Sequence, residues 1–165
     1  MSNSVAPRIE SANKEYASKF EKINIGPAPT HHVLVLTCMD ARLDVFRMLG
    51  RQIDEADVIC NGGGRVHDAL RSIICSLQLL ETREIILIHH TDCGFTHVNE
   101  EELRSKIRKN MNHVADYLAL MSFTDVKQSV LDDIHLLKNE PLVMNVPITG
   151  YVYHTEVEKL GRIQQ

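Results

Sequence analysis

Two cysteines and a histidine have the types and the spacing that a zinc ion requires. Cys38 stands alone, whereas His90 and Cys93 are separated by only two residues. Two thiolates and one imidazole suit zinc, and a His-x-x-Cys step lets one tight loop supply two ligands while a distant residue supplies the third. Three protein ligands leave one tetrahedral position open, where bound water becomes hydroxide near neutral pH and can attack an electrophilic carbon. These residues therefore predict a catalytic zinc site.

Asp40 and Arg42 follow the first cysteine by two and four residues. An ionised carboxylate only accepts hydrogen bonds, so Asp40 would accept the proton of the hydroxide and aim an oxygen lone pair at the substrate. The guanidinium of Arg42 would hold this carboxylate in place and keep it ionised. If Arg42 released it, Asp40 could fill the open position on zinc, which predicts a built-in inactive state. A weak surface ion pair is the plainer alternative.

The other cysteines and the neighbouring histidine have simpler explanations. Adjacent residues of a strand face opposite sides, so only one of His89 and His90 can face the metal, and the His-x-x-Cys spacing selects His90. Cys60 and Cys75 lack ligand partners at a useful spacing, so we expect both in the core. The three glycines at 62–64 match neither dinucleotide-binding nor P-loop patterns, and they predict a tight turn that lets the backbone approach the site closely.

Short apolar runs predict the strands that position these residues. They lie at residues 32–37, 56–60 and 84–89, and helical patterns follow at 43–49, 67–80 and 100–111. Alternating strands and helices predict an α/β fold with a mostly parallel central sheet flanked by helices. The carboxyl ends of parallel strands meet at one edge, so Cys38 and His90 can converge although 52 positions (90 minus 38) separate them.

The two ends of the chain predict peripheral elements. Residues 12–23 carry Tyr16, Phe20 and Ile23 at helical spacing, which predicts a peripheral N-terminal helix before the Gly-Pro-Ala-Pro break at 26–29. A further helix is expected at 124–138. The arms of a closing hairpin are expected at 150–153 and 159–163.

Composition excludes several classes of protein. With 165 residues, 44% of them hydrophobic and 24% charged, the chain has the profile of one globular domain. The net charge of -4, with the basic residues scattered, argues against a nucleic-acid partner. No apolar run approaches the ~20 residues of a membrane span. The first 22 residues hold three glutamates and no apolar segment, so we expect a cytoplasmic protein.

The run C-M-D-A-R, followed at a distance by H-H-T-D-C-G, resembles the β-class carbonic anhydrases, particularly their short members. The resemblance covers roughly residues 31–100 and implies that Cys38, His90 and Cys93 hold Zn²⁺, with Asp40 and Arg42 as the catalytic pair. It implies a single zinc domain over residues 1–165, of which 1–30 form an N-terminal helical arm.

This resemblance also implies an activity and an assembly. The expected reaction is hydration of carbon dioxide to bicarbonate by metal-bound hydroxide. Two alternatives remain open: a carbonyl sulfide hydrolase on the same zinc site, since the family includes carbonyl sulfide and carbon disulfide hydrolases, and a non-catalytic structural zinc module closed by Asp40. Family members are dimers or larger, and Tyr16 and Phe20 would fit a contact with a neighbouring copy.

The chain departs from its relatives at two positions near the expected site. Gly62 stands where relatives usually carry alanine, and Phe95 follows Cys93-Gly94 where relatives often carry methionine. Both departures bear on the shape of the substrate pocket rather than on metal ligation.

Overall fold

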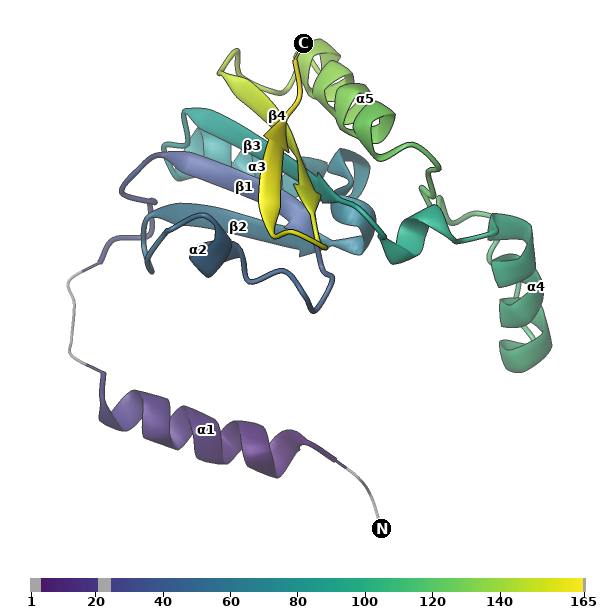
Figure 1. Ribbon diagram of the computed structural model, residues 1–165, viewed down its shortest axis with the longest axis horizontal. Coiled ribbons are helices and arrows are strands. Elements are labelled where there is room, and N and C mark those ends of the chain that lie inside the picture. The colour runs from purple at the N-terminus through teal and green to yellow at the C-terminus, as the bar shows by residue number, and fades with distance from the viewer. Residues whose placement is uncertain (1–3, 21–24, 165) are drawn as a thin grey trace.

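A five-stranded sheet forms the centre of the protein, in the order β2-β1-β3-β4-β5 (Figure 1). The structure is a computed structural model, and it describes residues 4–20 and 25–164. The strands are β1 (Val33–Cys38), β2 (Ala56–Asn61), β3 (Glu84–His90), β4 (Ile148–His154) and β5 (Lys159–Arg162). β1 pairs in parallel with β2 and β3, β3 pairs in parallel with β4, and β5 pairs antiparallel with β4. The predicted mostly parallel sheet and its closing hairpin are confirmed.

Helices cover both faces of this sheet. Helices α3 (Val66–Leu79) and α5 (Val126–Asn139) pack on one face, where they form the larger core with Leu34, Leu36 and Leu87. The short helix α2 (Val45–Met48) packs on the other face near Val35 and Ile88. β1 is buried along its whole length, as expected of an apolar strand with neighbours on both sides and on both faces.

Strand β3 sends its side chains alternately to the two faces. Leu87 and His89 face the layer of α3 and α5, whereas Ile88 and His90 face the layer of α2. Both histidines are fully buried. Two adjacent imidazoles are therefore placed on opposite faces of the sheet by the period of the strand alone.

Helix α4 (Glu100–Met111) has the predicted bounds. The side chain of Asn99 caps its first turn by accepting hydrogen bonds from the amides of Glu101 and Glu102. Glutamates occupy the first turn and basic residues the last, which complements the helix dipole. None of its residues is buried, and the helix stands away from the sheet (Figure 1).

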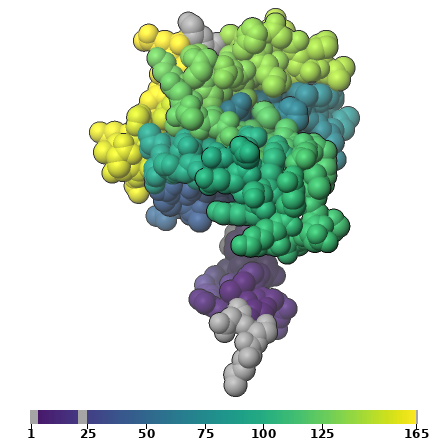
Figure 2. Space-filling view, turned by 90° about the vertical axis from the view of Figure 1, so that its right-hand side faces the viewer, coloured from purple at the N-terminus to yellow at the C-terminus, as the bar shows by residue number. Residues whose placement is uncertain are grey.

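The N-terminal helix, α1 (Ala6–Ser18), begins and ends earlier than predicted. Pro7 lies in its first turn, a start signal that the prediction of a helix at 12–23 overlooked. No residue of α1 is buried, and the helix lies apart from the sheet (Figures 1 and 2). Tyr16 and Phe20 are more than half exposed, and Ile23 lies outside the described residues.

The remaining predicted helices differ from the observed ones by small shifts at their ends. The helix expected at 43–49 is confined to α2, where Asp44 caps the first turn. No helix in the described part of the chain combines the length and the apolar character needed to cross a membrane.

Candidate metal centre

Cys38, His90 and Cys93 come together at the carboxyl edge of the sheet. Cys38 ends β1, His90 ends β3, and Cys93 lies in the loop that follows. Their ligand atoms all lie within 4.8 Å of one another, and the two sulfur atoms are 3.9 Å apart. Two sulfurs bound to one tetrahedral zinc at about 2.3 Å would lie about 3.8 Å apart. The spacing of the thiols therefore fits that ion.

The orientation of His90 supports the same interpretation. Its Nδ1 donates a hydrogen bond to the carbonyl oxygen of Thr91 over 2.9 Å, which leaves the lone pair on Nε2. Nε2 is buried, and it has no hydrogen-bond partner among the described residues. A buried nitrogen of this kind is costly unless something binds it. The donor set, one imidazole nitrogen and two sulfurs aimed at a common point, fits a zinc ion.

Backbone amides and the second thiol favour a thiolate at Cys38. The thiol of Cys93, the imidazole of His90 and the N–H groups of Asp40 and Gly63 all lie close enough to the Cys38 sulfur to stabilise its thiolate. The bond from Cys93 has the largest effect, and together they lower the pKa of Cys38 to about 4 although burial opposes them. The same thiol–thiolate contact raises the pKa of Cys93 above its usual range. Without a metal the pair therefore shares one proton.

Asp40 is held by Arg42 at the edge of this cluster. Its Oδ1 accepts hydrogen bonds from the Arg42 backbone N–H and Nε, and its Oδ2 accepts one from Nη2, each 2.9 Å long. These bonds hold the pKa of Asp40 far below its usual range, so the carboxylate stays ionised. Oδ2 lies 3.9 Å from Nε2 of His90. The carboxylate therefore lies beside the cluster, while its oxygens are hydrogen-bonded to Arg42.

Asp92 is a second partner of Arg42 that the sequence analysis did not identify. Arg42 Nη1 donates to the Asp92 carboxylate and Nη2 to the Asp92 carbonyl oxygen, both over 2.8 Å. The guanidinium is thus fixed between the two ligand-bearing loops. The position of Asp92, directly before Cys93 in the motif, was the available signal.

The glycine turn η1 (Gly62–Gly64) approaches the site as predicted. Gly64 has a φ of +72°, and a Cβ there would lie 3.0 Å from the backbone nitrogen of Cys38. The two departures from the relatives, glycine at 62 and phenylalanine at 95, are linked. A Cβ on residue 62 would lie 2.3 Å from the ring of Phe95. The larger ring at 95 occupies the space that an alanine at 62 would need.

The prediction that Cys60 and Cys75 lie in the core is wrong, since both are exposed. Cys75 follows the buried Ile73 by two residues, which is about 200° of helical rotation, so its side chain lies off the buried stripe of α3. Apolar neighbours in the sequence were a poor guide because a helix buries one face only.

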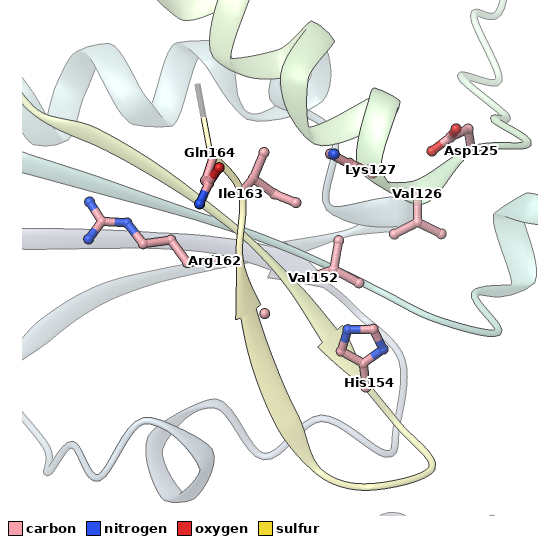
Figure 3. Close-up of a pocket in the computed structure, with 9 residues that line it drawn as sticks. Asp125, Val126, Lys127, Val152, His154, Arg162, Ile163 and Gln164 are labelled. Carbon is pink, nitrogen blue, oxygen red and sulfur yellow. The ribbon is translucent and has the colours of Figure 1, made fainter.

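A separate hollow of about 480 Å³ lies between α5 and the β4–β5 hairpin (Figure 3). Asp125, Lys127, His154 and Arg162 line it. Figure 3 shows the guanidinium of Arg162 directed away from His154 and Asp125, so the charges do not converge on one point. None of the predicted site residues lines it.

A second buried cluster lies on the opposite face of β3, and it was not predicted from the sequence. It joins His89 to Asp133, Arg65 and Ser129 through hydrogen bonds and ion pairs. The signal was Asp133 itself, a charged residue on the apolar stripe of α5 between Val130 and Leu137.

Comparison with known proteins gives consistent matches. The family model described as carbonic anhydrase matches residues 33–154. β-Carbonic anhydrase 1 of Mycobacterium tuberculosis is 36% identical over 156 residues, covering 92% of this chain and 93% of that protein. The carbon disulfide hydrolase of Acidianus sp. is 34% identical over 156 residues, covering 79% and 76%. The crystal structure of carbonic anhydrase from Streptococcus mutans superposes with a TM-score of 0.93 at 33% identity, covering 99% of this chain and 100% of that one.

Proposed function

This chain belongs to the β-class carbonic anhydrases, a family of enzymes, and on that premise we propose that it binds zinc and hydrates carbon dioxide to bicarbonate. The observation that carries the proposal is the convergence of Cys38, His90 and Cys93, with one buried imidazole nitrogen that has no hydrogen-bond partner in the described part of the chain. Three protein ligands would leave one position of a tetrahedral ion open to small molecules.

Zinc held by these three residues would supply a Lewis acid that lowers the pKa of water toward neutrality. Asp40, kept ionised by Arg42, can only accept a hydrogen bond. It would accept one from the attacking oxygen and so orient a lone pair of that oxygen toward the carbon of the substrate. Arg42, itself anchored by Asp92, would keep the carboxylate from moving onto the metal.

A closed structural zinc module is the non-catalytic alternative, with Asp40 as a permanent fourth ligand. Two strong hydrogen bonds from the Arg42 side chain to Asp40 weigh against it, since ligation would have to displace Arg42. The alternative predicts one zinc per chain and no turnover at any pH. Elemental analysis together with stopped-flow hydration assays on the same preparation tests it.

Hydrolysis of carbon disulfide or carbonyl sulfide is the second enzymatic candidate, and the 34% identity to the Acidianus carbon disulfide hydrolase favours it. These substrates resemble carbon dioxide in being small, linear and electrophilic at the central carbon, so the same residues would serve each reaction. We rank carbon dioxide first because the M. tuberculosis relative matches more of the chain. Parallel assays of hydration and of sulfide release decide, and a sulfide rate far above the hydration rate would reverse this ranking.

We also propose that the protein works as a homodimer or a larger homo-oligomer. The support is α1, a helix with no buried residue that carries exposed Ile9 and Tyr16 and is followed by exposed Phe20. Ile9 and Tyr16 are seven residues apart and so lie on the same side of the helix, where exposed apolar side chains can form a contact surface. Light scattering should give a mass of at least two chains, and replacing Tyr16 and Phe20 by serine should lower it.

A further inference from the structure

A buried polar cluster lies behind the candidate metal centre, on the face of the sheet covered by α3 and α5. Asp133 of α5 is 1% exposed and forms an ion pair with Arg65 over 3.0 Å. It also accepts a hydrogen bond from the backbone N–H of Val66 over 3.0 Å and lies 3.4 Å from Nε2 of His89. One carboxylate thus joins α5, the start of α3 and the end of β3.

His89 extends the cluster to the glycine turn. Its Nε2 lies 3.1 Å from the carbonyl oxygen of Gly64 and near Asp133, and since both are acceptors, Nε2 carries a proton and donates it. Its Nδ1 lies 2.6 Å from the hydroxyl of Ser129, which is a hydrogen-bond distance. The imidazole is therefore held from both sides.

The glycine turn carries this arrangement through to the metal ligands. Gly64 packs against the Cys38 backbone, and the N–H of Gly63 lies close enough to the sulfur of Cys38 to stabilise its thiolate. The ring of Phe123 closes the space beside Gly63 and stacks on His89 at 5.6 Å between ring centroids. Any shift of residues 63 and 64 would thus change the position of the Cys38 backbone and the approach of the Gly63 N–H to the Cys38 sulfur.

We propose that Asp133 is a positioning residue for the metal centre, acting from the opposite face of the sheet by fixing residues 63–66 so that the Gly63 N–H is aimed at the Cys38 sulfur. The inference rests on the proposed zinc function. Its physical basis is that groups which orient a metal ligand set the affinity of the site nearly as strongly as the ligands do. Asp133 contacts neither the ligands nor the substrate, and it acts through Arg65, Val66 and His89.

The test compares Asp133→Asn with Asp132→Asn. Asparagine keeps the size of the side chain and one acceptor for the Val66 N–H but removes the charge opposite Arg65. Asp132 is the adjacent, exposed carboxylate of the same helix and bonds only Gln128 among the described residues, so it controls for the loss of charge.

Two quantities are measured in the full-length variants. Zinc affinity, from competition with a chromophoric chelator, should fall about tenfold in Asp133→Asn and stay unchanged in Asp132→Asn. In the metal-free protein, hydrogen exchange at the Gly63 amide, followed by NMR, should accelerate by a similar factor. A merely structural role would lower the melting temperature and leave both quantities unchanged, which would overturn the proposal.

A milder variant covers the case in which Asp133→Asn does not fold. Ser129→Ala removes the hydroxyl that holds His89, and we expect zinc affinity to fall about fivefold, the equivalent of one hydrogen bond. Unaltered affinity in a folded Ser129→Ala protein would then refute the proposal. If the unmodified protein binds no zinc, the proposed function fails, and Gly63 exchange alone decides the role of Asp133.

Discussion

The two faces of β3 carry adjacent histidines in opposite chemical situations. On one face, His90 presents a buried nitrogen that has no partner among the described residues, next to two thiols that share a proton. On the other face, both nitrogens of His89 have partners, and the nearby carboxylate is matched by a guanidinium. Electron-pair donors that point at one place form a binding site, whereas groups that are bonded to one another and to the backbone hold the backbone in position.

The groups that would bind the metal and the groups that hold the backbone therefore lie on opposite faces of the same strand. Loss of a group on the face of His90 should remove function and leave the metal-free fold intact. Loss of a group on the face of His89 should reduce stability first and affect the metal indirectly. The following variants test that division.

Cys93→Ser should give the largest effect. Because serine is a poor zinc ligand, zinc content should fall from one per chain to near zero, and hydration should fall by roughly 10³-fold or more. Elemental analysis and stopped-flow assays measure both. The unfolding free energy of the metal-free protein should stay within about 1 kcal/mol of the parent.

Cys75→Ser is the matched control, since Cys75 is exposed on α3. It should keep zinc and full activity. Substantial turnover by Cys93→Ser would contradict the assignment of this cysteine as a ligand.

Arg65→Met should show the opposite pattern. Removing the guanidinium leaves the carboxylate of Asp133 buried without its ion-pair partner, and we expect a loss of about 3 kcal/mol in unfolding free energy. Urea denaturation measures the loss, with Arg71→Met at an exposed position of α3 as the control. Adding Asp133→Leu to Arg65→Met should restore most of the stability. If Arg65→Met alone lost well under 1 kcal/mol of unfolding free energy, the cluster would contribute little to the stability of the fold.

Arg42→Ala tests the residue that holds Asp40 at the edge of the candidate metal centre. The variant should retain one zinc per chain, while hydration falls roughly 10- to 100-fold because Asp40 loses the hydrogen bonds that hold and ionise it. The pKa of Asp40 should rise toward its usual range, so the remaining activity should be lost at a higher pH on acidification. Arg47→Ala is the control, and equal rates in both variants would remove the proposed role.

Zinc affinity should depend on pH, and the change in affinity expected for each pH unit is the smallest of these predicted effects. Binding needs both thiols deprotonated, and in the metal-free protein Cys38 has a pKa of about 4 while that of Cys93 is raised. Near neutral pH, binding therefore releases at least the Cys93 proton, and affinity should rise about tenfold per pH unit between pH 6 and 8. Asp133→Asn should keep this slope at a lower affinity, whereas a pH-independent affinity would mean that the pair is already fully ionised.

The sequence was a good guide where the residues themselves impose periodicity. The apolar runs of β1 and β3 marked buried strands, and the charged helical pattern of α4 gave its bounds. The sequence was a poor guide at α1, where the start signal at Pro7 was overlooked, and at Cys75, where apolar neighbours concealed an outward-facing position. Asp92 and the Asp133 cluster were missed because their partners are distant in the chain.

The amino-acid order alone determined which atoms could hold a metal and which strands would carry them, because ligand chemistry and the two-residue period of a strand are local properties. It also placed His89 and His90 on opposite faces. Only the tertiary structure decided that Arg42 links Asp40 to Asp92, that the ring of Phe95 occupies the space above Gly62, and that Asp133 bonds the start of α3 beside the glycine turn. Those contacts join segments as far apart as 67 positions, and their existence depends on how helices and strands pack in space.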